Sequence, residues 1–410
     1  MDALKLLLVL AGIVIALRRR LSVGITMVLA GPLAALLYWV PLKSLFICYR
    51  EVFLSERFIV LTALVVTITI LGNLLKELGY LSRLATACQG LYGGSKTAAA
   101  IMPGLIGLMP MPGGSLLSAP LVDSVLTDKS DSSRYSPHFK CVVNYWFRHL
   151  TEFSWPVYAG LILTEAITGL PIAKVSLLQV PLSVFMFILG LLLFIRKVSD
   201  GSAAGHALWW PLVGIAGSVW PVVLAIVLYG VLDVPLTLAV LGSLVLLMVI
   251  SRPSWGMIKG SLKQGFSPEL LLLIFGVLSF QSIIELTGGV EAISRLATEY
   301  HLPKELVVFL VMVTIGLLTG MVSAYVGLGY TLLAGLLYQP VLNPGLIMLA
   351  YLSGFIGMMF SPAHLCLILT NNYFGSDLVK VYRLLIVPLL LLGIGGILLY
   401  ISGYGALFVD

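Results

Sequence analysis

The sequence predicts an all-α polytopic membrane protein built from two inverted-topology repeats, with about ten spans and two re-entrant helical hairpins. The chain is 60% hydrophobic and only 10% charged, whereas soluble domains are about 25% charged. One stretch occurs twice, at 156–175 and at 362–381. Each half also holds an apolar segment that Gly interrupts near its middle. Duplication around interrupted segments is typical of secondary transporters.

The internal duplication is carried by residues that rarely match by accident. PVYAGLILTEAITGLPIAKV at 156–175 aligns without a gap to PAHLCLILTNNYFGSDLVKV at 362–381. The pentapeptide SRLAT also recurs in the same order, at 82–86 and at 294–298. A repeat of this length indicates a duplicated structural unit. The identical pairs are Pro156/Pro362, Leu161/Leu367, Ile162/Ile368, Leu163/Leu369, Thr164/Thr370, Gly169/Gly375, Lys174/Lys380 and Val175/Val381.

Apolar runs long enough to cross about 30 Å of hydrocarbon occur along the whole chain. The first is followed by Arg18, Arg19 and Arg20 rather than by a cleavage site, so we interpret it as a retained span and not as a signal peptide. Mixed charged and apolar stretches at 76–96 and 287–304 are typical of amphipathic connectors at the membrane surface. The expected spans are 3–17, 21–40, 58–75, 138–168, 177–195, 208–230, 235–250, 268–286, 343–370 and 383–402.

Two further apolar segments, 97–127 and 305–338, are interrupted in the middle. The first is broken by the run from Met109 to Gly114, and the second by the run from Ser323 to Gly329. Each arm has about 13 residues, or about 20 Å of helix, which is too short to cross the hydrocarbon. We expect each segment to enter the membrane and return to its own side. The alternative is two short ordinary spans joined by a tight turn.

The positions of Lys and Arg indicate the orientation in the membrane. With the N-terminus outside, sixteen of these residues fall on the cytoplasmic side and seven outside, in agreement with the positive-inside rule. An odd number of crossings in the first repeat, 1–200, then inverts the second repeat, 201–410. The expected hairpin and broken helix are 97–127 and 138–168 in the first repeat, and 305–338 and 343–370 in the second.

The hairpin tips are candidate binding elements, because irregular backbone at membrane depth must be buried or face water. Amides at the start of the returning arm favour an anion. Carbonyls at the end of the entering arm suit a cation, and Na⁺ near Gly113 and Ser115 is one candidate. The alternative is that glycine merely permits a tight turn. The candidate tip residues are Pro112, Gly113, Gly114, Ser115, Ser323, Gly327, Gly329 and Thr331.

A proline interrupts one span in each half, at Pro156 and at Pro362, and frees a backbone carbonyl about four residues earlier. Arg148, His149 and Glu152 lie near the first break and are expected to face the protein interior. Arg148 and Glu152 are one helical turn apart. They either pair with each other, or Arg148 meets an anionic solute while Glu152 or His149 takes a coupling proton. The candidate residues of both breaks are Asn144, Arg148, His149, Thr151, Glu152, Ser361, His364, Thr370, Asn371 and Asn372.

Other polar residues and sequence motifs narrow the possible classes of function further. Asp123, on the returning arm of the first hairpin, is read as a buried acid that could ligate a cation, carry a proton or cap a helix. Cys48, Cys88, Cys141 and Cys366 have no CxxC spacing, so we interpret them as small buried apolar residues rather than as a disulfide or metal framework. No basic run predicts nucleic acid, and the HExxH, Walker and GxSxG motifs are absent. No cofactor is expected beyond a coupling Na⁺ or H⁺.

The runs PGGSLLSAPLVDSV at 112–125 and SPAHLCLILTNNYF at 361–374 resemble those of an uncharacterised prokaryotic integral membrane family, catalogued as domain of unknown function 401. That family is grouped with the ion transporter superfamily of carboxylate and arsenite carriers and sodium/proton antiporters. The resemblance implies inverted repeats, elevator-type transport and a homodimer. Sodium-coupled dicarboxylate members carry Ser-Asn-Thr at each tip, whereas this chain has Gly113-Gly114-Ser115 and Ser323-Ala324-Tyr325. The resemblance therefore implies neither sodium coupling nor dicarboxylate specificity.

These observations lead to the hypothesis of a secondary active transporter that moves a small organic anion across a prokaryotic inner membrane, driven by H⁺ or Na⁺. One alternative is cation/proton exchange through Asp123, Glu152 and His149. Another, from a different class, is a membrane-embedded enzyme with Glu152 and His149 as acid and base. Paired hairpins argue against the enzyme, because a catalyst needs no alternating access.

Overall fold

The computed structural model describes residues 2–19, 21–90, 95–108, 114–127, 135–199, 209–338 and 341–409. Within these ranges all regular secondary structure is helical, which confirms the predicted all-α class. Among the described residues, five helical stretches are long and apolar enough to cross a membrane, judged by length and composition. They are Glu56–Glu77, Ile172–Lys197, Leu212–Gly230, Trp255–Leu286 and Leu378–Ile401.

The order of helices in the first half recurs in the second. From α4 and from α14 onward, each half has a long helix, a short connecting helix, a set of short helices, an interrupted helix and a long closing helix. The first half contains α1 (Asp2–Arg18), α2 (Val23–Leu37), α3 (Leu42–Leu54), α4 (Glu56–Glu77), α5 (Tyr80–Gly90), α6 (Ser95–Gly107), α7 (Ser115–Leu126), α8 (Pro137–Arg148), α9 (Ala159–Thr168) and α10 (Ile172–Leu193). The second contains α11 (Trp209–Gly230), α12 (Leu236–Ser251), α13 (Trp255–Gly265), α14 (Pro268–Leu286), α15 (Val290–Glu299), α16 (Lys304–Thr319), α17 (Val322–Ala324), α18 (Tyr330–Leu337), α19 (Pro344–Met359), α20 (Leu365–Phe374) and α21 (Leu378–Ile401).

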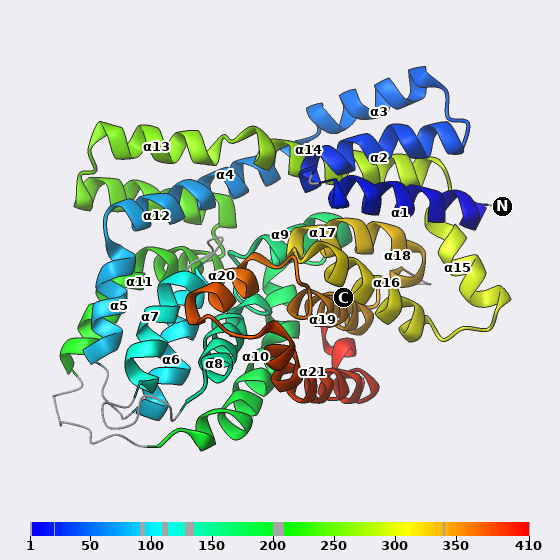
Figure 1. The fold of residues 1–410 in the computed structure, drawn as a ribbon. Helices are drawn as coiled ribbons and strands as arrows, with labels where there is room; N and C mark the ends of the chain where they lie inside the picture. Colours follow the sequence, from blue (N-terminus) through cyan, green and yellow to red (C-terminus); the bar gives the residue numbers. More distant parts are fainter. Residues whose placement is uncertain are drawn as a thin grey trace.

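The two halves exchange packing partners. α1, α2 and α3 pack on α14 and α15 of the second half, while α11, α12 and α13 pack on α4 and α5 of the first. Asn73 of α4 donates a hydrogen bond to Ser261 of α13 at 3.1 Å. In Figure 1, α1 to α4 lie with α12 to α14 along one side of the molecule, and the interrupted helices lie on the other side. We call this layer the scaffold, and of the interrupted helices α9 contacts it through α4.

Local sequence explains where the interrupted helices begin and end. α8 and α19 begin at a proline preceded by Ser136 and Asn343, whose side-chain oxygens each accept an amide hydrogen of the first turn. α9 and α20 end at Gly169 and Gly375, both in the left-handed conformation that glycine adopts without strain. These two glycines are aligned in the duplicated stretch, so the sequence repeat and the structural stop coincide.

The chain is irregular in both halves near the prolines at 156 and 362. After α8, a 3₁₀ turn (Leu150–Glu152) and six non-helical residues lead to α9. After α19, residues 360–364 lead to α20. The second interrupted segment continues to Phe374, four residues beyond the predicted end at 370. The first interruption is mostly buried, whereas Pro362 and Ala363 of the second interruption are exposed and only Ser361 and His364 beside them are buried.

The apolar segment 305–338 is interrupted earlier than the sequence suggested. The break predicted at 323–329 is wrong, because α16 ends at Thr319 and Gly320 has a φ of +64°. A left-handed residue stops a helix, and glycine adopts that conformation at little steric cost. Tyr325–Gly329 form a π-helical turn between α17 and α18. Of the first predicted break, Met109–Gly114, residues 109–113 lie outside the described residues, whereas Gly114 and Ser115 of the predicted tip are described.

Glycines bring α16 and α19 into direct backbone contact. A methyl group at Gly316 would meet the carbonyl oxygen of Gly354, and a methyl group at Gly357 would meet the carbonyl oxygen of Val313. Small residues at a helix interface allow such close approach inside membranes. The contact positions the second hairpin against the second interrupted helix.

We predict that Gly357→Ala destabilises the fold by about 1–3 kcal/mol, because the added methyl group forces two backbones apart. Thermal unfolding of the detergent-solubilised protein, followed by loss of the monodisperse peak, measures the effect. Gly242→Ala is the matched control, since a methyl group at this exposed helical position meets nothing within 4 Å. Equal unfolding temperatures for both variants would contradict the predicted contact.

Candidate functional site

The interrupted segments of both halves meet in one buried region. α7 packs on α8 and on α20, and α8 packs on α20. Ser115 donates to the carbonyl oxygen of Cys366 at 3.1 Å. The Asn144 amide donates to the carbonyl oxygen of Ser115 at 2.9 Å and to the Thr370 hydroxyl at 3.4 Å. The first hairpin and both interrupted helices are thus joined by buried hydrogen bonds.

Arg148 places a guanidinium between the end of α6 and the start of α7, the two arms of the predicted first hairpin. The residue is 1% exposed, and its Nη1 donates to the Tyr158 hydroxyl at 2.9 Å. A methyl group at Gly114 would lie 2.6 Å from Nη2, and one at Gly107 would lie 3.5 Å from Nη1. Glycine at position 114 therefore leaves room for the guanidinium, whereas the close contact of a methyl group at Gly107 would be with the carbonyl oxygen of Arg148 at 2.7 Å. A buried guanidinium beside the start of α7 creates a local field that favours an anion.

Side chains of the first interrupted helix cap the carbonyl end of α6. Thr151 donates to the Gly107 carbonyl oxygen at 2.9 Å, and the Trp155 indole donates to the Leu108 carbonyl oxygen at 3.0 Å. The Tyr158 hydroxyl also donates to the Gly107 carbonyl oxygen. The final carbonyls of a helix have no partner within the helix. These hydrogen bonds provide partners for the carbonyls of Gly107 and Leu108 and join the end of α6 to the first interrupted helix.

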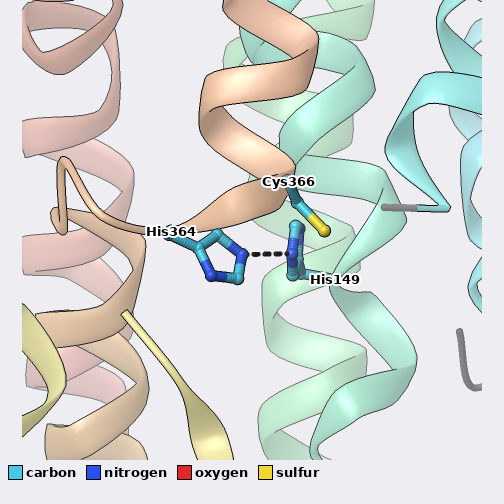
Figure 2. Close-up of side chains that lie close together, drawn as sticks. All are labelled: His149, His364 and Cys366. Carbon is cyan, nitrogen blue, oxygen red and sulfur yellow. Dashed lines mark hydrogen bonds between the residues drawn. The ribbon is translucent and has the colours of Figure 1, made fainter. Parts of the chain in front are cut away.

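His149 and His364 face each other across the two halves. The His149 Nε2 lies 3.0 Å from the His364 Nε2 (Figure 2). The His149 Nδ1 lies 2.6 Å from the Tyr145 carbonyl oxygen, and the His364 Nδ1 lies 2.7 Å from the Gly320 carbonyl oxygen. A carbonyl oxygen only accepts, so each Nδ1 must carry the hydrogen. The Glu152 carboxylate is 3.8 Å from the His149 Nε2.

The same region contains buried polar atoms that have no hydrogen-bond partner among the described residues. They are the Oδ1 of Asn144 and the Oε2 of Glu152. Buried oxygens are hydrogen-bonded in the great majority of cases, so an exception in a polar cluster indicates a place where a ligand or water binds. The described residues that gather here are Gly114, Ser115, Asn144, Arg148, His149, Thr151, Glu152, His364 and Thr370.

Several predicted site residues make local contacts instead. The Thr331 hydroxyl donates to the Gly327 carbonyl oxygen of its own helix at 2.7 Å. A methyl group at Gly327 would meet Val277, and one at Gly329 would meet Met312, so both glycines serve packing. Ser323 is buried and lies three residues after Gly320, where the helix is interrupted.

The remaining candidates lie in the second half or outside the described ranges. Ser361 accepts the amide hydrogen of Ala363 at 3.2 Å and stabilises the turn before α20. Asn371 accepts from Ser376 at 2.5 Å, near the end of α20. Asn372 is exposed. Pro112 and Gly113, with the Na⁺ site suggested there, fall outside the described residues.

Asp123 belongs to a separate ion pair. Its Oδ1 lies 2.7 Å from the ammonium nitrogen of Lys140, which also donates to Thr127 at 2.8 Å. The Asp123 side chain is 40% exposed, so the expectation of a buried acid is wrong. The side chain lies on α7 facing the start of α8, and its partner neutralises it.

Sequence reasoning missed two residues of this site and one residue of a separate cavity. Tyr158 aligns with His364 in the duplicated stretch, and this alignment is the one signal that could have found it. Cys366 was assigned to the apolar core, yet its thiol lies within 4.8 Å of the ligand nitrogens of His149 and His364. Arg57 lines a separate cavity of about 460 Å³, and no local pattern marks that position.

Comparison with known proteins identifies the family to which this chain belongs. The model of a family described as "Protein of unknown function (DUF401)" matches residues 2–402. The chain belongs to this family. No curated protein matches the sequence of this DUF401 member. The resemblance seen in its motifs is therefore confirmed, while the family description assigns no activity.

A solved structure has a similar fold. The crystal structure of the Alcanivorax borkumensis YdaH transporter, described as having an unusual topology, aligns with a TM-score of 0.57 and 14% identity. The alignment covers 90% of this chain and 91% of that chain. At this identity the likeness concerns the fold alone. It supports a multi-pass helical membrane protein with a transporter-like fold.

We predict that Asp123 and Lys140 are energetically coupled. A double-mutant cycle with Asp123→Asn and Lys140→Met should give a coupling free energy of about 0.5–3 kcal/mol, because the pair is in contact. Thermal unfolding of the four proteins measures it. A second cycle that combines Asp123→Asn with Lys259→Gln, at an exposed position on α13, should be additive. Additivity in both cycles would show that the ion pair contributes nothing to the free energy of unfolding.

Proposed function

We propose that this DUF401 protein is a secondary active transporter for a small organic anion. The observation that carries the proposal is the Arg148 guanidinium, 1% exposed and held between the arms of the first hairpin. Ionisable groups at membrane depth are costly and usually mark a solute or ion pathway. A carboxylate-like group matches the planar fork of arginine.

The proposal includes two inverted repeats that move a solute in an elevator-type cycle. Tyr158 and His364 support the duplication, because they are aligned in the sequence repeat and make equivalent contacts. Tyr158 donates to the last carbonyl of α6, and His364 donates to Gly320, just after α16. The exchanged packing of the two halves supports it as well. The homodimer, the inner membrane and the outside N-terminus are further parts of the proposal, and coupling is to H⁺ or Na⁺.

Cation/proton exchange receives less support. In that alternative Asp123 would carry the ion, yet its carboxylate is paired with Lys140 at 2.7 Å. A paired carboxylate must first lose its partner before it binds a cation, which adds to the free-energy cost. The alternative also leaves the buried Arg148 without a role in transport.

Uptake by proteoliposomes tests the proposal. Vesicles containing the purified protein are given an inward H⁺ or Na⁺ gradient and a panel of radiolabelled mono- and dicarboxylates. We expect accumulation of at least one carboxylate above that in protein-free vesicles. Arg148→Gln should lower this uptake by at least about 10-fold, and Arg148→Lys should also lower it, because a lysine lacks the planar fork.

The control is Lys259→Gln, which removes an exposed positive charge of the scaffold and should leave uptake unchanged. Full uptake by Arg148→Gln would contradict the anion site. Gradient-driven cation flux that survives Arg148→Gln and is lost in Asp123→Asn would instead support cation/proton exchange.

A further inference from the structure

Two imidazole nitrogens and one thiol sulfur, from both halves of the chain, converge in the buried interior. His149 follows the end of α8, while His364 and Cys366 lie at the start of α20. Their ligand atoms all lie within 4.8 Å of one another. Figure 2 shows the two imidazoles facing each other with the Cys366 sulfur beside the His149 ring. The three residues are between 0% and 8% exposed.

The hydrogen bonds of the two imidazoles are those of metal ligands. Each Nδ1 donates to a backbone carbonyl oxygen, that of Tyr145 for His149 and that of Gly320 for His364. In the neutral rings both Nε2 atoms then carry a lone pair, and these lone pairs face each other at 3.0 Å. Two lone pairs repel unless a proton or a metal ion lies between them. Histidines that bind a metal almost always donate their other nitrogen in this way.

The distances suit a tetrahedral ion after a small adjustment. Zn–N bonds of about 2.0–2.1 Å place two ligand nitrogens about 3.3 Å apart, and a Zn–S bond is about 2.3 Å. The observed nitrogen separation is 3.0 Å, so an opening of a few tenths of an ångström is enough. The Cys366 thiolate and the nearby Glu152 carboxylate together would balance the charge of a divalent ion. Charge balance matters because uncompensated charge is costly in a buried site.

We propose that His149, His364 and Cys366 bind one soft d¹⁰ transition-metal ion, either Zn²⁺ or Cu⁺. Thiolate and imidazole donors select these ions over Na⁺, Ca²⁺ and Mg²⁺, which prefer oxygen ligands. Glu152, whose Oε1 lies 3.8 Å from the His149 Nε2 and whose Oε2 is buried without a hydrogen-bond partner among the described residues, is the candidate for a fourth ligand. The ion would join α8 to α20 and thereby connect the two halves. This inference stands independently of the transported solute.

Metal titration of the whole protein tests the proposal. The tag-free protein in detergent is treated with chelator and titrated with Zn²⁺, or with Cu⁺ under reducing conditions, against a competing chromogenic chelator. We expect one equivalent of one of these ions to bind and to raise the unfolding temperature, because an ion that binds only the folded state stabilises it. No binding of either ion in competition with the chelator would overturn the proposal.

Variants assign the ligands. His149→Ala, His364→Ala and Cys366→Ser should each weaken binding by more than about 10-fold, since loss of a ligand exceeds the effect of losing an outer-shell partner. Cys141→Ser and His301→Ala are matched controls, a buried free cysteine and an exposed histidine outside the cluster. Equal weakening in the controls, or unchanged binding in all three ligand variants, would overturn the assignment.

Two spectroscopic measurements on the unmutated protein need no variant that might fail to fold. Co²⁺ substitution should give a thiolate-to-cobalt charge-transfer band. X-ray absorption of the Zn²⁺ or Cu⁺ protein should show one sulfur at about 2.3 Å and two imidazole nitrogens at about 2.0–2.1 Å. A shell of oxygen atoms alone, or one with no sulfur, would contradict the proposed site.

Discussion

The need to satisfy helix-end carbonyls inside a membrane protein organises this structure. A helix that stops at membrane depth leaves carbonyl oxygens without partners, and lipid supplies none. Here side chains of the interrupted segments fill that role. The carbonyls of Gly107, Gly320 and Met359 accept from Tyr158, His364 and Tyr145, respectively. The carbonyl of Glu152 accepts from Tyr351 at 2.9 Å. The interrupted segments are therefore held by each other.

This constraint also shapes the chemistry of the centre. Because both histidines use their Nδ1 hydrogens on carbonyls, their Nε2 lone pairs point at each other. The two halves provide helix-end carbonyls with partners in the same way, because Tyr158 and His364 hold equivalent positions in the sequence repeat. The two halves differ in the charged side chains that they supply. The positions that align with Arg148 and His149 are Gly354 and Phe355, so the first half supplies the charged groups.

Much of the fold was predictable because its signals are local. Prolines and glycines mark the interruptions, and the aligned Gly169 and Gly375 mark two helix ends. The break at Gly320 was misplaced because several glycines follow it in the sequence. The sequence alone does not distinguish a glycine that ends a helix from one that allows close packing, whereas the positive φ of Gly320 does. His149 and His364 were predicted as site residues from the two breaks, but their contact with each other and with Cys366 was not predictable. His364 and Cys366 are 215 or more residues from His149, so no spacing in the sequence connects the two halves of the cluster.

A cryo-EM structure in lipid nanodiscs, at a resolution that shows side chains, tests the central claim most directly. The account predicts that the two hairpins enter from opposite faces of the bilayer and that Tyr158 and His364 cap Gly107 and Gly320 near its midplane. Hairpins on the same face, or carbonyl ends that face lipid without side-chain partners, would contradict it.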